Sequence, residues 1–302
     1  MTQILRKSAQ KSQGFAVDSR DSAKDSRESK DSAKDSHKSK DSAKHSAVDS
    51  IYSIYSPDEL QKYDNLIALF MERDCLKISE FADLMGDFEV ELEIAKSLGI
   101  PLYTQNDMIF CDIGKDIFDG TFCIVDIETT GFSPLSDEII EIGAIKYRNG
   151  EVLERFESYI FAPIVPPKIT EITNITADMI ATAPPLSAVL RDFKVFLEAN
   201  IFMAHNIRFD FNFINGKLSL CGIPPMKNAR ICTLELARKT ICAEKYGLGY
   251  PNEFLDINSA VRHRALADCE IAIKVFETSL LNLPPQVRSI RDLIRFSKGK
   301  IK

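Results

Sequence analysis

The stretch that most constrains the fold is an apolar run, residues 122–131, interrupted by Asp126 and Glu128. The run is rich in β-branched and aromatic residues and ends in Gly131, which predicts a buried strand closed by a turn. The two acids are two residues apart, so they project from one face of a strand. Buried together without a partner, they would repel each other. Divalent cations such as Mg²⁺ or Mn²⁺ prefer oxygen ligands and fit this pair. A solvated surface pair is the alternative interpretation, because the chain has 44 acidic residues.

Composition limits the classes of protein to consider. The 302 residues and 45% hydrophobic content are enough for one substantial domain and a small one. A net charge of −6 excludes a polycation that coats nucleic acid indiscriminately. The 7 cysteines form no C-x-x-C pair, which argues against a disulfide framework or a zinc cluster and favours a reducing cytoplasm. No apolar stretch approaches 18 residues, so we expect neither membrane insertion nor secretion.

Residues 1–55 are of low complexity. The tetrapeptide Asp-Ser-Ala-Lys begins at Asp21, Asp31 and Asp41, and Ser, Lys, Asp and Arg fill the gaps. A ten-residue period places no stripe of alanines on a helix, and almost nothing apolar is available for a core. We therefore predict disorder for this segment.

Residues 56–117 are predicted to form a small helical module that resembles a winged helix. Ser56 and Pro57 are typical of a helix start, and shorter helices are expected over 79–84 and 88–98. Apolar runs on either side of Asn106-Asp107 predict a β-hairpin. Residues 57–107 contain 12 acidic and 4 basic side chains, which would repel a phosphate backbone. This composition favours protein docking or a structural role over DNA reading.

Residues 118–282 are predicted to form an α/β domain. Strands are expected over 122–129, 138–147 and 152–161, with Asn149-Gly150 as a hairpin turn. Short strands over 201–204 and 230–233 alternate with helices over 186–198, 208–221 and 264–281. This order predicts a mixed sheet flanked by helices. Residues 283–302 hold six basic side chains and one acidic, and we interpret them as a basic tail, either a contact for nucleic acid or a partner, or a solvated helix end.

Two further motifs pair a histidine with an aspartate. His205 and Asn206 precede Asp210 where a short strand passes into a helix, and His263 precedes Asp268 at the start of the last long helix. On one sheet, the four acids Asp126, Glu128, Asp210 and Asp268 could converge from three elements. Four converging carboxylates require cations, and two divalent ions would satisfy them.

The motifs D-I-E-T-T-G, H-N-x-x-F-D and H-R-A-L-A-D, in this order, resemble those of the DEDDh (DnaQ-like) 3′→5′ exonucleases, a family related to the proofreading epsilon subunit of bacterial DNA polymerase III. The resemblance covers about residues 118–282 and implies a ribonuclease-H-like fold. It also implies two Mg²⁺ or Mn²⁺ ions. The segment between Thr240 and His263 departs from the family, whose members usually carry a longer leucine-rich helix there.

The resemblance assigns roles to residues by position. It implies that the four acids bind the metal ions and that His263 is the general base. The pocket for the terminal nucleotide would be lined by the following residues: Thr129, Thr130, Gly131, Phe132, Ile175, His205 and Asn206. For His205, a structural hydrogen bond is an equal alternative to a substrate contact.

The resulting expectation is a cytoplasmic 3′→5′ exonuclease acting on single-stranded DNA 3′ ends, in proofreading beside a replicative polymerase subunit or in repair. An RNA-trimming exonuclease and an inactive scaffold are the alternatives. The residues of the predicted pocket do not separate ribose from deoxyribose, because that distinction depends on contacts to the 2′-hydroxyl.

Overall fold

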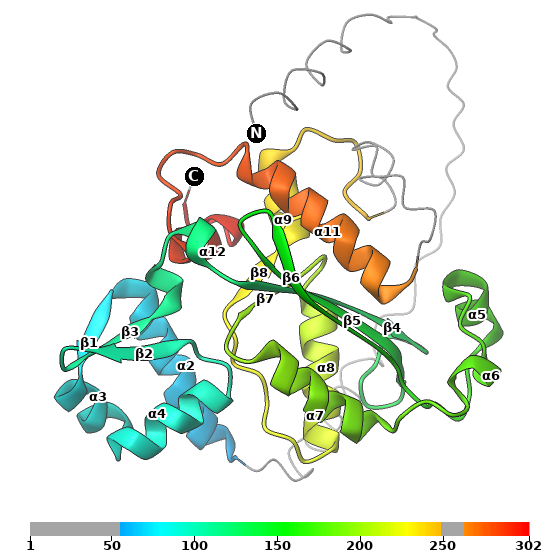
Figure 1. Ribbon diagram of the computed structural model, residues 1–302, viewed down its shortest axis with the longest axis horizontal. Helices are drawn as coiled ribbons and strands as arrows, with labels where there is room; N and C mark the ends of the chain where they lie inside the picture. The colour runs from blue at the N-terminus through cyan, green and yellow to red at the C-terminus, as the bar shows by residue number, and fades with distance from the viewer. Residues whose placement is uncertain (1–54, 249–262, 302) are drawn as a thin grey trace, which may run out of the picture. The chain divides into compact units, whose positions relative to one another are not determined.

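The computed structural model describes residues 55–248 and 263–301 (Figure 1). The predicted disordered repeats, apart from Tyr55, lie outside the described residues, as does the segment 249–262 ahead of the last motif. Within the described ranges, no helix is both long enough and apolar enough to cross a membrane.

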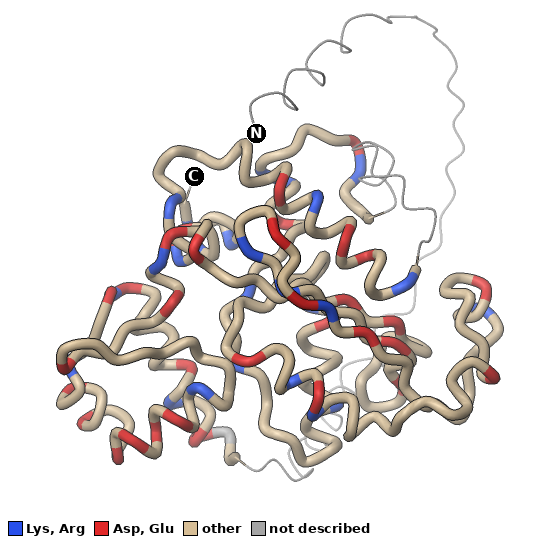
Figure 2. The backbone as a smooth tube through the Cα atoms, in the orientation of Figure 1, with Lys and Arg blue, Asp and Glu red and all other residues tan. Residues whose placement is uncertain are grey.

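The N-terminal module contains three helices and a three-stranded antiparallel sheet with strand order β1-β3-β2. Its elements are α2 (Pro57–Glu72), β1 (Cys75–Lys77), α3 (Ile78–Met85), α4 (Phe88–Ser97), β2 (Leu102–Gln105) and β3 (Met108–Cys111). Ser56 and Glu59 form a capping box that starts α2. Asn106 and Asp107 both adopt positive φ, as a tight hairpin turn requires. The expected helices and hairpin are therefore present, while β1 was not predicted. Acidic positions follow one another along α4 (Figure 2).

A five-stranded mixed sheet forms the centre of the following part, with strand order β6-β5-β4-β7-β8. Its strands are β4 (Phe122–Thr129), β5 (Ile139–Arg148), β6 (Glu151–Tyr159), β7 (Ile201–Ala204) and β8 (Arg230–Cys232). The first three are antiparallel neighbours, and β7 and β8 run parallel to β4. Asn149 and Gly150 form the turn between β5 and β6, both with positive φ. The predicted mixed sheet flanked by helices is confirmed.

Helices cover both faces of this sheet (Figure 1). The helices of this part of the chain are α5 (Pro167–Thr173), α6 (Ala177–Ile180), α7 (Leu186–Leu197), α8 (Arg208–Leu220), α9 (Thr233–Thr240), α11 (Ala265–Leu280) and α12 (Ile290–Ser297). The covering helices include α11 on one face and α7 and α8 on the other. Single 3₁₀ turns occur at Asp112–Gly114 and Ile117–Asp119. Phe122 and Ile124 of β4 belong to the core that includes α11, whereas Cys123 and Val125 belong to the core that includes α7 and α8. Because strand side chains alternate, Asp126 and Glu128 share the face of Phe122 and Ile124.

The C-terminal segment corrects one expectation. Residues 283–302 were expected as a basic tail, but they contain α12, whose apolar side chains are buried. Arg291 lies between this helix and the N-terminal module and forms an ion pair with Asp74 at 2.7 Å. Residues of α12 and of the N-terminal module belong to one hydrophobic cluster. The helix is therefore neither a free tail nor a solvated helix end, because its apolar face completes this core.

Candidate active site

The first two acids lie where the strand register and a glycine bring α11 onto the sheet. Asp126 is paired with Gly143 of β5, and Glu128 with Glu141. A Cβ at Gly143 would lie 2.5 Å from the backbone nitrogen of Leu266, in the first turn of α11. Only a glycine permits so close an approach of helix to strand. The start of α11 therefore rests on the sheet directly beside Asp126.

A buried ion pair fixes the same helix end. Glu141 is fully buried and accepts hydrogen bonds from the Arg264 guanidinium, from Nε at 2.9 Å and from a terminal nitrogen at 2.7 Å. The Glu141 carboxylate also accepts the Ala265 backbone N–H at 3.0 Å, which is one of the unpaired N–H groups of the helix start. The guanidinium carbon lies 5.2 Å from the centre of the Tyr159 ring. Arg264 is thus held from several sides, directly after His263 in the chain.

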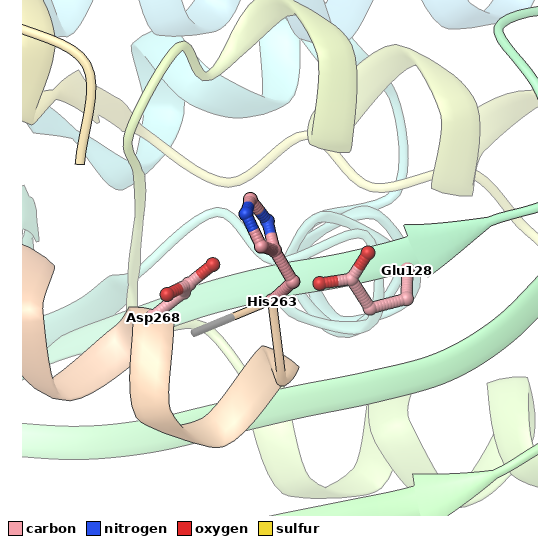
Figure 3. A group of neighbouring side chains, drawn as sticks. All are labelled: Glu128, His263 and Asp268. Atoms are coloured by element: carbon pink, nitrogen blue, oxygen red, sulfur yellow. The ribbon is translucent and has the colours of Figure 1, made fainter. Parts of the chain in front are cut away.

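Glu128, His263 and Asp268 form one cluster (Figure 3). Each offers a carboxylate oxygen or imidazole nitrogen, and these atoms all lie within 4.8 Å of one another. Glu128 projects from β4 and Asp268 from the first turn of α11, while His263 precedes the helix with a φ of 57°. The imidazole lies at the exposed side of the cluster, and the two carboxylates are half-buried. The structure thus brings three of the five predicted catalytic side chains within coordination reach of one point.

The other two acids, Asp126 and Asp210, interact with this cluster through their charges. Asp210, in the first turn of α8, is almost fully buried, and burial raises its pKa to about 7 against hydrogen bonds from backbone N–H groups, including that of Ile127. Burial, and then the charges of Asp210 and Asp268, raise the pKa of Asp126 well above its usual range. The pKa of Glu128 rises to about 8 through burial and then the charge of Asp268, while Arg264 opposes the rise. Without cations, these side chains hold protons that ordinary carboxyl groups would lose.

Hydrogen bonds within the loop after β4, and an ion pair to α8, hold that loop in place. Thr129 donates from its hydroxyl to the Gly131 carbonyl at 2.6 Å, and the Thr130 hydroxyl accepts the Glu138 N–H at 2.8 Å. Lys217 of α8, itself buried, forms an ion pair with Glu138 at 2.9 Å. At the tip of this loop, Phe132 is 90% exposed, and its ring centre lies 6.3 Å from that of Phe209. An aromatic side chain this exposed offers a stacking surface beside the acids.

Three further predicted pocket residues have different surroundings. The His205 imidazole contacts the Thr233 hydroxyl at 3.0 Å and the Tyr246 carbonyl at 2.6 Å. Burial lowers the pKa of His205 to about 4, so the ring is neutral, donates from Nε2 to Tyr246 and accepts from Thr233. These contacts favour the structural alternative for His205. Asn206 is exposed, with a φ of 69°. Ile175 is fully buried in a small core cluster, so in this structure it supports its loop and presents no side-chain surface to a nucleotide.

Sequence reasoning missed Gly143, Glu141 and Arg264. A signal existed for Glu141, which is the one charged residue between Ile139 and Ile145 in an otherwise apolar strand. Its partner, 123 positions further along the chain, could not be found from local pattern.

A five-stranded mixed sheet with carboxylates from β4, α8 and α11 near one another defines a ribonuclease-H-like nuclease fold. Comparison with known proteins agrees. The chain belongs to the RNase T exonuclease family, which matches residues 123–276, just over half of the chain. It therefore carries an exonuclease domain.

Curated relatives include the PolC-type DNA polymerase III of Staphylococcus aureus, 36% identical over 182 residues. This match covers 59% of the present chain and 12% of the polymerase, so the chain corresponds to a small part of that relative. Among solved structures, a zinc-bound complex of Escherichia coli exonuclease I with single-stranded DNA has a TM-score of 0.51 at 19% identity, covering 55% of this chain and 41% of that one. A second structure of exonuclease I has a TM-score of 0.50 at 18% identity, covering 58% and 43%. These structural likenesses concern the fold alone.

Proposed function

We propose that this protein is a metal-dependent 3′→5′ exonuclease that removes nucleotides from DNA ends, in proofreading or repair in the bacterial cytoplasm. The observation that carries the proposal is the cluster of Glu128, His263 and Asp268, with ligand atoms within 4.8 Å of one another. DNA as substrate is supported by the similarity to a DNA polymerase III. That similarity also supports a replicative polymerase subunit as a partner.

The donor set fits divalent cations. Carboxylate oxygens are the ligands that Mg²⁺ and Mn²⁺ prefer, and the raised carboxyl pKa values are those of acids that are buried and lie near other acids without a neutralising charge. Asp126, Glu128, Asp210 and Asp268 are the residues that we propose to hold two such ions. Bound there, the ions would offset the negative charge of the scissile phosphate and of the departing 3′-oxygen.

The protein's own side chains have separable tasks in this proposal. The His263 imidazole, at the exposed side of the cluster, accepts a proton from the attacking water. The Phe132 ring stacks on the terminal base. The Thr129–Gly131 backbone, held by Glu138 and Lys217, keeps that ring at a fixed position beside the acids.

The test uses single-stranded DNA and RNA of equal sequence, labelled at the 5′ end, with Mg²⁺, Mn²⁺ or EDTA. We expect a ladder of products shortened from the 3′ end, no cleavage in EDTA, and faster cleavage of DNA than of RNA. Asp126→Asn and Asp268→Asn should abolish cleavage, whereas Asp192→Asn, an exposed acid on α7, should not change it. His263→Ala should lower the rate by roughly 10²–10⁴-fold while DNA binding is retained.

Cleavage that continues in EDTA, or an Asp126→Asn variant as fast as the parent, would overturn the metal-dependent assignment. Faster cleavage of RNA would replace DNA as the substrate. A 5′-mononucleotide as the first labelled product would reverse the proposed direction.

A further inference from the structure

A cavity of about 760 Å³ lies between α2, the segment leading into β8, helix α8 and the end of α12. Its size falls within the range of small-molecule sites. Arg230, which lines it, is the first residue of β8 and aligns through Phe202 with Cys123 of β4. Asp126 lies three residues further along β4, about 10 Å at the usual rise of a strand, and two strands away. The cavity is therefore distinct from the acidic cluster.

The charge of its lining is opposite to that of the whole chain. Five basic and two acidic residues contribute: Lys227, Arg230, Arg295, Lys298, Lys300, Asp64 and Glu72. Two ion pairs, Lys227 with Asp64 at 2.7 Å and Arg295 with Glu72 at 3.0 Å, use both acids. Arg230, Lys298 and Lys300 have no carboxylate partner in the part of the chain that the structure describes. An excess of three positive charges thus surrounds the cavity in a protein of net charge −6.

These three cations lie close enough to repel one another. The pKa of Lys298 is lowered by partial burial and then by the charges of Arg230 and Lys300. Burial likewise lowers the pKa of Arg230, which a charge on Asp64 only partly opposes. An anion between these side chains would remove their mutual repulsion.

The remaining walls suit an organic, planar ligand better than a bare anion. The Arg230 guanidinium lies 4.4 Å from the centre of the Phe211 ring. Ile67 and Met71 of α2 contribute half-buried apolar surface. Asn212 is exposed, and its side-chain amide makes no hydrogen bond with any described residue. A cation cluster, an apolar wall and an unused amide together resemble the donor set that recognises a phosphate, a base face and a base edge.

We propose that this cavity binds a nucleotide, with Arg230, Lys298 and Lys300 holding its phosphate and the α2 wall contacting its base. The nucleotide is either free or part of a strand, since both present the same phosphate and base. Occupancy does not depend on the catalytic cluster, so the two proposals stand or fall separately.

The test is calorimetric titration of the full chain in low salt with EDTA, which excludes hydrolysis and metal-dependent binding. The probes are deoxyadenosine 5′-monophosphate, unphosphorylated deoxyadenosine and a twelve-residue deoxythymidine oligonucleotide. The variants are Arg230→Gln, Lys298→Met and Lys300→Met. The control is Lys168→Met, which changes the net charge equally and removes an exposed lysine of α5 that forms no ion pair with any described residue.

We expect the phosphorylated probe to bind with one site per chain and deoxyadenosine to bind at least tenfold more weakly. Arg230→Gln should weaken binding by about tenfold or more, because a guanidinium can hold a phosphate with two parallel hydrogen bonds. Each lysine variant should weaken binding by about three- to tenfold, because an ammonium group acts as a single point charge. Binding of the mononucleotide identifies the free ligand. Variant-sensitive binding of the oligonucleotide alone identifies a strand.

The proposal is overturned if neither phosphorylated probe binds at millimolar concentration. It is equally overturned if deoxyadenosine binds as tightly as its monophosphate, or if Lys168→Met weakens binding as much as the lysine variants of the cavity. The two lysine variants keep the test decisive if Arg230→Gln fails to fold, since both lysines are exposed at the end of the chain.

Discussion

Replacing Gly143 by alanine should separate the geometry of the active site from the stability of the fold. The added Cβ would lie 2.5 Å from the Leu266 nitrogen, 2.6 Å from the Ala265 carbonyl carbon and 2.9 Å from the Leu266 Cα. All three are backbone atoms at the start of α11, so no side-chain rotation relieves the clash. Non-bonded heavy atoms settle at roughly 3.5 Å, so the helix end must move by about 1 Å.

That displacement acts directly on the proposed chemistry. His263 lies two residues before the first residue of this helix, and Asp268 lies in its first turn. Asp126 and Glu128 stay on the sheet, so the distances between the two sets of side chains change by a similar amount. A shift of about 1 Å at a reacting centre costs on the order of 10²-fold in rate. The overpacking itself should cost about 1–3 kcal/mol in unfolding free energy.

The assay compares the rate of DNA shortening with the urea midpoint of unfolding for Gly143→Ala and a matched glycine variant. Gly150→Ala is the control, because its Cβ would meet nothing within 4 Å while its φ of 88° makes alanine unfavourable. We expect Gly150→Ala to lose stability and keep its activity under folding conditions. The reasoning is refuted if Gly143→Ala is folded and cleaves DNA at the parent rate.

Three further outcomes are expected. Glu128 has a folded pKa of about 8 against an ordinary value of 4.5, so the stability it contributes is full below pH 4.5 and is lost as the pH rises to 8. In EDTA, the melting temperature of the parent should therefore fall more steeply over this window than that of Glu128→Gln. Equal slopes would contradict the pKa shift. At pH 8, Mn²⁺ should restore the melting temperature of the parent and have less effect on Asp126→Asn, as measured by scanning calorimetry. Arg264→Ala leaves the buried Glu141 carboxylate without its cation and should lower the free energy of unfolding in urea by about 3 kcal/mol. Adding Glu141→Gln should partly restore stability in the double variant. Additive losses would show that the pair is not coupled.

Elements with strong local signals were predictable. The strand Ile201–Ala204 was predicted from four consecutive apolar residues, and all four are buried. The helix α2 was predicted because Ser56 and Pro57 precede an amphipathic run, and Ser56 is its N-cap. The acids of the site were located by motif. Their convergence depends on the parallel pairing of β7 with β4, which carries Asp210 toward Asp126 and which spacing alone does not determine.

Other elements were missed for identifiable reasons. The helix α12 was not predicted, because its arginines were interpreted as a basic tail. Its N-terminus has a capping box formed by Ser289 and Asp292, of the same type that the structure shows at the start of α2. Its basic residues were interpreted as solvated, whereas Arg291 is buried against the N-terminal module. The domain boundary at residue 117 stays a prediction.

One hydrophobic cluster includes Phe70 and Ile109 of the N-terminal module and Leu293 of α12. This shared core determines how the protein unfolds. A chain truncated to begin after residue 117 would expose apolar side chains of α12 to water, where they would favour aggregation. The N-terminal module therefore covers the apolar face of α12, and we expect the module and the nuclease sheet to unfold in one cooperative transition.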